Sequence, residues 1–299
     1  MKKIFILTIL LFTALISCNK SEKLKIIVPA GAPALSQIYL QDSGKYDVDI
    51  VNGPDPLVAA FGSESHDFIF APTNLGAKVY NNGIQYKFIA AVTFGNYYLA
   101  STLDNFKIED LQNKEIICFG KNATSDIVLN YVLDGNSIQA DIIYVDSLDM
   151  ANSELVIDND KIILSAEPAL SVLKTKVEGI STIDLQAEYA ELSGTGSYPQ
   201  SGVFAKANLE DKIIDDFLNK LEASVEDVNQ DAEGTASLAV ELDYNFTYDV
   251  LVQAISQSNI DFEKAEEVKT SLEYYFNIIM EMNPALVGGK LPDEGFYYS

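Results

Sequence analysis

The residues best suited to binding a ligand follow a short apolar run near the start of the chain. Residues 68–70 have the length of a buried strand, Pro72 ends it, and Thr73 and Asn74 are residue types that commonly begin a helix. In an open parallel sheet such a junction lies at the carboxyl edge, where ligands bind and the first helical turn offers free N–H groups. Thr73 and Asn74 therefore either bind a small solute or serve only as helix caps.

Side chains that could act as nucleophiles or metal ligands are few. Cys118 lies in the apolar run I-I-C-F, which predicts a buried structural thiol rather than a nucleophile. His66 is the single histidine and has no second histidine or cysteine near it in sequence, so we expect an edge position without metal binding or catalysis. No nucleophile stands beside a general base, and we expect a protein that binds without chemistry and needs no cofactor.

The net charge argues against two classes of partner. The 299 residues carry 44 acidic and 20 basic side chains, which gives a formal charge of −24 at pH 7, and every basic side chain is a lysine because the chain has no arginine. An excess of acid this large argues against nucleic acid and against an anionic membrane surface. The chain length predicts two lobes rather than a single core.

The N-terminus has the pattern of an export signal. Two lysines precede an apolar run over residues 4–16 that is too short to span a bilayer comfortably, and Ser17 then precedes Cys18. This order is similar to the lipobox of bacterial lipoproteins, in which the cysteine is acylated. We therefore expect residues 1–17 to be a signal peptide, Cys18 to anchor the protein outside the cytoplasm, and residues 18–23 to be a tether. The alternative is an ordinary signal peptide with an incidental cysteine.

Strand and helix patterns alternate along most of the chain. The predicted strands of a first unit are residues 24–28, 47–51, 68–70 and 88–93, and those of a second unit are 115–119, 142–145, 161–164 and 180–185. Helical patterns fit between them, including one that starts at Thr73 and ends near Gly83. This order predicts α/β units with mainly parallel sheets covered by helices. The acidic stretch 146–160 fits either a helix or a loop.

The last third of the chain returns to the first unit. The short apolar run 202–205 predicts a strand that crosses back, and the chain reads as helical from residue 208. In that region Ile213, Phe217 and Leu221 recur at intervals of four, as on the buried face of a helix. We therefore assign residues 24–102 and 203–299 to a first lobe and residues 103–202 to a second.

Six segments, in this order and spacing, resemble the solute-binding lipoproteins of ABC importers. They are A-P-T-N-L-G-A-K at 71–78, T-F-G-N-Y-Y-L at 93–99, F-G-K-N-A-T-S-D-I-V-L at 119–129, S-A-E-P-A at 165–169, S-Y-P-Q-S-G-V-F at 197–204 and the G-G-K-L-P tail. The group includes nitrate-, sulfonate-, taurine- and thiamine-precursor-binding proteins. The resemblance implies the type II periplasmic-binding-protein fold, with two α/β lobes, two crossing strands and a ligand cleft between the lobes. It also implies an ABC permease as partner, and we expect a monomer.

The resemblance places the ligand-binding residues at strand–helix junctions of both lobes and near the hinge. These residues are Gly31, Ala32, Thr73, Asn74, Phe94, Asn96, Tyr97, Asn122, Thr124, Ser125, Glu167 and Tyr198. Several have a simpler structural explanation. Thr124 and Ser125 can act as helix caps alone, and Glu167 can be an exposed acid in the first turn of its helix. Tyr97 and Tyr98 alternate along a strand, so we expect one in the core and the other facing the cleft.

The chemistry of these loops favours a neutral or cationic ring compound as the solute. Members of the group that bind anions must recognise a negative charge, and arginine commonly does this through two parallel hydrogen bonds. This chain has no arginine. The predicted loops are instead rich in groups that stack or form hydrogen bonds. A small anion held by helix N-termini is the second choice. The alternative function is an enzyme on the same fold, of the thiamine-pyrimidine or menaquinone-precursor type.

Overall fold

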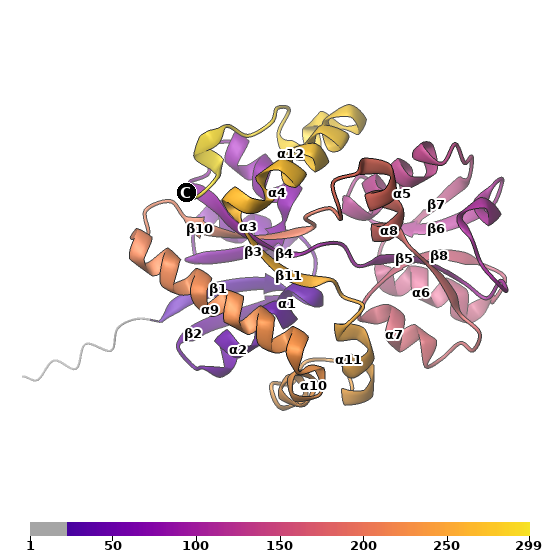
Figure 1. Cartoon of the computed structure of the whole chain (residues 1–299), viewed down its shortest axis with the longest axis horizontal. Helices are drawn as coiled ribbons and strands as arrows, with labels where there is room; N and C mark the ends of the chain where they lie inside the picture. The colour runs from indigo at the N-terminus through magenta and orange to yellow at the C-terminus, as the bar shows by residue number, and fades with distance from the viewer. Residues whose placement is uncertain (1–22) are drawn as a thin grey trace, which may run out of the picture.

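The computed structural model describes residues 23–299 and shows two lobes side by side, joined at a narrow centre (Figure 1). Each lobe is built on one β-sheet with helices on both faces. This arrangement confirms the predicted α/β class with two lobes. The predicted signal peptide and Cys18 lie outside the described residues. None of the helices between residues 23 and 299 combines the length and apolar character that a membrane crossing needs.

The first sheet has six strands in the order β11-β4-β10-β3-β1-β2. Their bounds are β1 (Leu24–Pro29), β2 (Tyr46–Val51), β3 (Phe68–Pro72), β4 (Tyr86–Thr93), β10 (Ser201–Lys206) and β11 (Ile260–Lys264). Strand β1 pairs parallel with β2 and β3, whereas β10 runs antiparallel between β3 and β4. The predicted return strand at 202–205 is therefore present and is inserted in the middle of the first sheet.

The second sheet has five strands in the order β7-β6-β8-β5-β9. Their bounds are β5 (Tyr97–Ser101), β6 (Glu115–Phe119), β7 (Asp141–Val145), β8 (Ile162–Ala166) and β9 (Ser181–Asp184). Strand β6 is parallel to β7 and β8, and β5 is antiparallel to β8 and β9. The chain therefore passes from one sheet to the other at residues 94–96, whereas the sequence analysis kept residues up to 102 in the first lobe.

Two groups of helices cover the first sheet. On one face lie α1 (Ala32–Ser36), α2 (Ile38–Asp42), α9 (Asp211–Gln230) and α10 (Ala232–Glu241); on the other lie α3 (Asp55–Ser63), α4 (Thr73–Asn81) and α12 (Ala265–Met282). The helix α11 (Tyr248–Ile255) follows α10, and short 3-10 turns at Pro284–Val287 and Glu294–Phe296 complete the first lobe. The periodic face predicted around Phe217 is confirmed, because Phe217 is buried and its ring stacks on Phe68 at 3.7 Å between centroids.

The second sheet is covered by α5 (Thr124–Gly135) and α8 (Leu185–Ser193) on one face and by α6 (Leu148–Ile157) and α7 (Ala169–Lys174) on the other, with a 3-10 turn at Ile108–Leu111. The stretch 146–160, which the sequence left open, forms helix α6. Ser147 starts this helix, because its Oγ accepts a hydrogen bond from the Met150 N–H at 3.2 Å.

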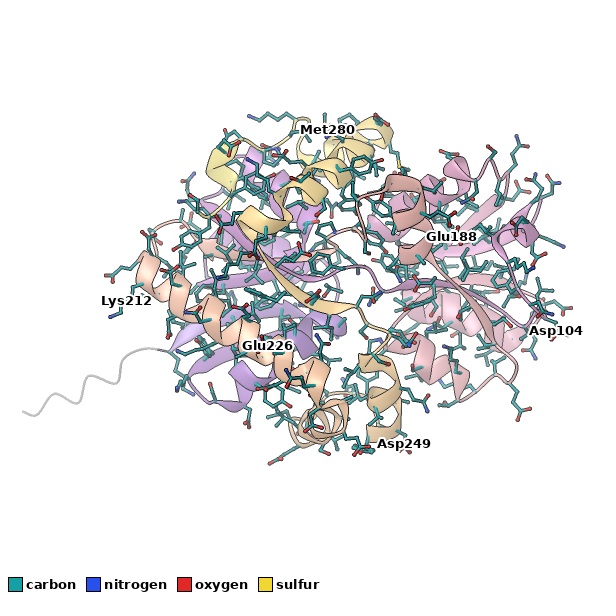
Figure 2. All side chains as sticks on the ribbon, in the orientation of Figure 1. Asp104, Glu188, Lys212, Glu226, Asp249 and Met280 are labelled. Carbon is teal, nitrogen blue, oxygen red and sulfur yellow. The ribbon has the colours of Figure 1, made fainter. Side chains whose placement is uncertain are left out.

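The charge of the protein is carried mainly on its outer surface. Asp104, Glu226 and Asp249 are exposed on separate elements of the two lobes (Figure 2). Within 4.0 Å the described residues form four ion pairs, each with a partner at least 42% exposed. Exposed pairs of this kind contribute little to stability. The buried apolar residues therefore account for most of the stabilisation, and one continuous core reaches from α3 in the first lobe to α5 in the second.

Candidate functional site

Four strand–helix junctions meet where the lobes face each other. They follow β1 and β3 in the first lobe, and β6 and β8 in the second. Gly31 on the β1–α1 junction lies close to Pro168 at the start of α7, since a Cβ placed on Gly31 would be 3.9 Å from Pro168 Cδ. The Tyr131 and Tyr274 hydroxyls, from α5 and α12, form a second contact between the lobes at 3.3 Å. The two lobes are therefore in contact at this boundary.

A chain of hydrogen bonds crosses the hinge from one lobe to the other. The Thr73 N–H donates to the Gln200 carbonyl oxygen at 3.0 Å, and Gln200 Nε2 donates to Asn96 Oδ1 at 3.0 Å. Asn96 Nδ2 then donates to the Glu167 carbonyl oxygen at 2.7 Å, and the Glu167 N–H donates back to the Asn96 carbonyl oxygen at 3.1 Å. The two segments that cross between the lobes, residues 94–96 and 194–200, thus tie the start of α4 to the start of α7.

Thr73 and Asn74 do not cap their own helix by side-chain hydrogen bonds. Thr73 is fully buried, and its hydroxyl donates to the Pro199 carbonyl oxygen at 2.7 Å, which fixes α4 to the returning segment. The Asn74 amide makes no side-chain hydrogen bond among the described residues, and its Oδ1 is buried. Of the two, Asn74 is the residue with hydrogen-bonding capacity left for a ligand.

The β6–α5 junction holds the predicted residues in two different environments. Thr124 and Ser125 are buried and make no capping bond; the Ser125 hydroxyl donates to the Phe119 carbonyl oxygen at 2.7 Å. Asn122 is exposed in a left-handed conformation, with φ of 60°, and its N–H donates to Asp126 Oδ2 at 2.8 Å. The structure therefore brings Thr124 and Ser125, but not the Asn122 side chain, into the interior of the boundary.

Four tyrosines from both lobes and the hinge form a buried group that we call the tyrosine cluster: Tyr97, Tyr189, Tyr198 and Tyr275. Tyr198 is at its centre, with ring centroids 6.5, 5.1 and 5.6 Å from those of Tyr97, Tyr189 and Tyr275. Burial raises the pKa of each of these phenols, so they stay protonated at neutral pH and are neutral hydrogen-bonding groups.

One glutamine holds two members of the tyrosine cluster in place. Gln186 Oε1 accepts hydrogen bonds from the Tyr198 hydroxyl at 2.8 Å and from the Tyr97 N–H at 2.9 Å. Gln186, Tyr189 and Tyr275 were not predicted from the sequence as site residues. No simple sequence signal identifies them as site residues. Tyr275 has the helical spacing of apolar core residues, and Gln186 and Tyr189 lie on α8, which was not predicted as a helix.

Tyr97 and Tyr98 are both buried, on opposite sides of β5. Tyr97 belongs to the tyrosine cluster, whereas the Tyr98 hydroxyl donates to the Gln257 carbonyl oxygen at 2.7 Å, just after α11 of the first lobe. Tyr98 therefore forms another contact between the lobes. We expected one ring in the core and the other facing the cleft, whereas both rings are buried, in apolar clusters on opposite faces of β5.

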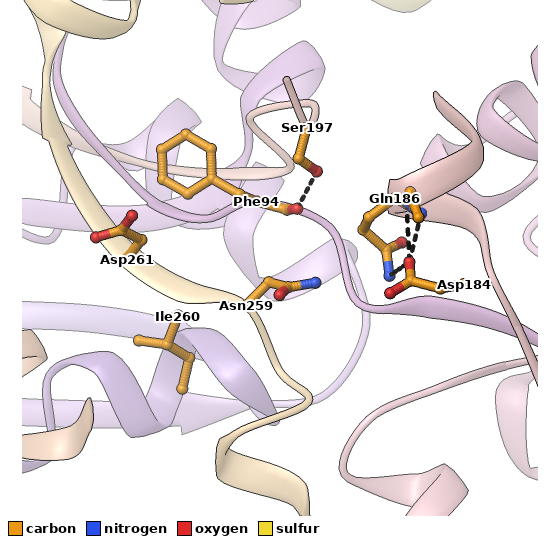
Figure 3. Close-up of a pocket in the computed structure, with 8 residues that line it drawn as sticks. Phe94, Asp184, Gln186, Ser197, Asn259, Ile260 and Asp261 are labelled. Atoms are coloured by element: carbon orange, nitrogen blue, oxygen red, sulfur yellow. Dashed lines mark hydrogen bonds between the residues drawn. The ribbon is translucent and has the colours of Figure 1, made fainter. Parts of the chain in front are cut away.

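A hollow of about 370 Å³ lies beside the hinge (Figure 3). Its lining residues are Phe94, Asp184, Gln186, Ala187, Ser197, Asn259, Ile260 and Asp261. Most of them belong to the edge strands β11 and β9, to the start of α8 and to the crossing segments. The four strand–helix junctions, in contrast, follow β1, β3, β6 and β8. The hollow is therefore on the other side of the crossing segments from Gly31 and Glu167. Phe94, predicted as a ligand contact, lines this hollow.

Glu167 is buried rather than exposed. Only 3% of its surface is accessible, its Oε2 accepts a hydrogen bond from the Ser171 N–H at 3.1 Å, and its Oε1 has no partner among the described residues. Burial raises the pKa of the carboxyl group, because the ionised form loses hydration. The explanation of Glu167 as an exposed first-turn acid is therefore wrong.

The residues with potential for catalysis or metal binding lie apart from one another. Burial raises the pKa of Cys118 to about 12, which keeps the thiol protonated and confirms the prediction of a buried thiol. His66 Nε2 lies 3.0 Å from Asp49 Oδ2 at the outer part of the first lobe. Within residues 23–299 no group of three or more His, Cys, Asp and Glu side chains is arranged to hold a metal ion.

The architecture is that of periplasmic binding proteins, with two lobes that each carry one sheet and that are joined by crossing segments. The structure is similar to a crystal structure of an ABC transporter from Parabacteroides distasonis, with a TM-score of 0.82 and 23% identity over 93% of this chain and 99% of that chain. It is also similar to the periplasmic aliphatic sulphonate binding protein SsuA from Escherichia coli, with a TM-score of 0.73, 13% identity and coverage of 93% and 92%.

A third similar structure is the ligand binding component of an ABC-type import system from Staphylococcus aureus with zinc bound. Its TM-score is 0.69, with 14% identity over 93% of this chain and 97% of that chain. No protein-family profile and no curated protein matches the sequence. The comparisons confirm the predicted periplasmic-binding-protein fold over nearly all of the described chain.

Proposed function

We propose that this protein is the extracytoplasmic solute-binding component of an ABC import system. It captures a small solute by closure of its two lobes and delivers it to a membrane permease. The observation that carries the proposal is the meeting of four strand–helix junctions at the boundary of the lobes, with buried polar side chains from both sides. The printed names of the similar structures, which include import and sulphonate-binding proteins, support the same function.

We infer a neutral or cationic solute with a flat ring, bound by the protein as a monomer without a cofactor. The tyrosine cluster supplies aromatic faces, and Asn74, Asn96, Thr124 and Ser125 supply polar groups nearby. An aromatic contact contributes about 0.5–1.5 kcal/mol beyond the area it buries. A small anion is the second choice, since SsuA is a sulphonate binder and the starts of α4 and α5 offer backbone N–H groups.

Ligand screening is expected to reveal a solute that raises the melting temperature and compacts the protein. A solute that binds only the folded state stabilises it by about 2.7 kcal/mol at a hundred times its dissociation constant. Thermal shift against ring compounds, amino acids, vitamins, nitrate and alkyl sulfonates identifies candidates, and titration calorimetry measures their affinity. Small-angle scattering should then show a smaller radius of gyration in the saturated complex.

Two results would contradict parts of this proposal. Tight binding of nitrate, taurine or an alkyl sulfonate, with no response to ring compounds, would replace the ring solute by an anion. An unchanged radius of gyration at saturation would argue against lobe closure, although not against binding. If the solute is a ring compound, Tyr97→Ala should weaken its binding, and an unchanged affinity would exclude Tyr97 as the residue that contacts it.

We also propose that Cys18 carries a lipid anchor. The apolar leader and the order L-I-S-C support this proposal. The Cys18→Ser variant of the full chain is expected to lose acylation and move to the soluble fraction, because a single cysteine provides the attachment point. Membrane fractionation and detergent phase separation measure the change. Retention in the membrane with unaltered detergent behaviour would contradict the lipoprotein assignment.

A further inference from the structure

We propose that Glu167 selects a positively charged solute, by presenting its free carboxylate oxygen to a protonated amine or another cationic N–H group of that solute. This inference rests on the proposed solute-binding function and narrows it, because it chooses a cation over a neutral compound or an anion. It concerns the oxygen Oε1, which has no hydrogen-bond partner among the described residues.

The Glu167 carboxylate is buried and only half satisfied by hydrogen bonds. Glu167 is 3% exposed, and only Oε2 is satisfied within the protein, by the Ser171 N–H. No lysine or histidine nitrogen of the described residues lies within 4.0 Å of the carboxylate. A buried charge without a partner is strongly unfavourable, and buried polar atoms are nearly always paired. An unpaired carboxylate at a boundary between lobes therefore marks a place for a partner that arrives from outside.

Glu167 lies where the second lobe meets the hinge and the first lobe. Its N–H and carbonyl oxygen are both bonded to Asn96 in the first crossing segment. The next residue, Pro168, faces Gly31 of the opposite lobe. Elements of both lobes and of the hinge thus surround Glu167, and closure of the lobes contributes to its burial. A cation bound there would be removed from water by the same closure, which strengthens the attraction between the two charges.

The polar and charged groups of the two lobes also bear on which solute Glu167 could bind. At the opposite junction Asn74 has an amide without a hydrogen bond, which can donate or accept. Tyr98 is the tyrosine close enough to feel the charge of Glu167, and it is neutral because burial and the charges of Asp184 and Glu167 raise its pKa. The chain has no arginine, and Lys121, at the β6–α5 junction, is exposed and lies over the Tyr144 ring at 4.9 Å. The positive side chain whose charge reaches Glu167 is the exposed Lys174 at the end of α7; it lowers the pKa of the carboxyl group, but by less than burial raises it, and it forms no ion pair with Glu167 within 4.0 Å.

A purely structural role for Glu167 makes the opposite prediction for stability. If the carboxylate were present to hold the start of α7 through Ser171, its neutralisation would lower the melting temperature of the protein without solute. If it is kept for a cationic solute, its neutralisation removes an unpaired buried charge, and the melting temperature should stay unchanged or rise. The two roles are thus separated by a measurement that needs no solute.

The test uses the full chain and ring compounds in matched sets that differ only in charge, namely benzylamine, benzyl alcohol and benzoate, each with larger two-ring analogues. Titration calorimetry compares the wild type, Glu167→Gln and the control Glu178→Gln, which removes an exposed carboxylate from the same lobe. We expect the amines to bind best, and Glu167→Gln to weaken them by about 100-fold. The control should change their affinity by less than about threefold.

Each other outcome has a definite meaning. If none of these compounds binds while a non-cationic solute from the wider screen does, this inference fails and the solute-binding function stands; if no solute in either set binds, both fail. If only alcohols or carboxylates bind, or if Glu167→Gln weakens amines and alcohols equally, the inference fails while the solute-binding function stands. A lower melting temperature of Glu167→Gln in the absence of solute, combined with unchanged amine affinity, would assign Glu167 a structural role.

Discussion

Replacing Tyr198 with alanine is expected to lower the free energy of unfolding by about 3–5 kcal/mol, as for other large buried aromatic residues. Tyr198 is fully buried on the returning segment and contacts three other rings of the tyrosine cluster. Its removal leaves a cavity where both lobes and the hinge meet, and it also leaves Gln186 with one hydrogen bond fewer. Chemical denaturation monitored by circular dichroism measures the loss.

The matched control for this variant is Tyr198→Phe, which keeps the ring and removes only the hydroxyl. The Gln186 oxygen retains the bond from the Tyr97 N–H, so the cost should be about 0.5–1.5 kcal/mol. Packing of the ring would then account for most of the alanine effect. Equal losses for the two variants would instead assign the stabilisation to the hydrogen bond and contradict the packing explanation.

The second large effect is expected for Gly95→Ala in the first crossing segment. Gly95 has φ of 82°, and a Cβ at this position would lie 2.5 Å from Gln186 Cγ and 2.6 Å from Tyr198 Cζ. An alanine held in the left-handed backbone conformation lowers the free energy of unfolding by about 1–3 kcal/mol. Overpacking of a buried site lowers it by about 1–3 kcal/mol more. The variant should therefore lose roughly 2–6 kcal/mol of stability, and relief of the clash would push the hinge apart.

Gly83→Ala is the control that measures how much stability is lost through backbone strain alone. Gly83 has φ of 89° and is exposed after α4, and a Cβ added there would have no neighbouring atom within 4 Å. The variant should lose only the stability that backbone strain costs, about 1–3 kcal/mol, and its solute affinity should not change. Thermal denaturation and titration of both variants make the comparison. A Gly95→Ala variant no less stable than Gly83→Ala would show that Gln186 and Tyr198 move aside at little cost.

The architecture was largely predictable, because its signals are local. Apolar runs of strand length alternate with helical patterns, and Gly83 lies in the left-handed conformation that the sequence predicted for the end of α4. The return strand was recognisable because Gly202 and its neighbours form an isolated apolar run. Strand β11 was not predicted, because I-D-F-E-K mixes charges with apolar residues, and its place beside β4 depends on tertiary pairing.

The site was predictable only in outline. Junctions after buried strands can be found from sequence, so Thr73, Thr124 and Glu167 were identifiable as a set. What each side chain contacts depends on residues far away in sequence. Thr73 bonds to Pro199, and the buried Glu167 has its backbone bonded to Asn96 and its neighbour Pro168 close to Gly31. A pattern of residue types contains no information on such distant partners, and for this reason the first-turn explanation of Glu167 failed.

The place of β10 between β3 and β4 has a consequence for how the chain acquires its structure during synthesis. The five strands of the second sheet come from one continuous stretch, residues 97–184, whereas the first sheet needs strands on both sides of that stretch. When residue 184 has been made, the second sheet has all its strands, but β3 and β4 still lack the strand that joins them. Pairing across such a large separation is slow. The lobe that begins the chain is therefore the last to be completed.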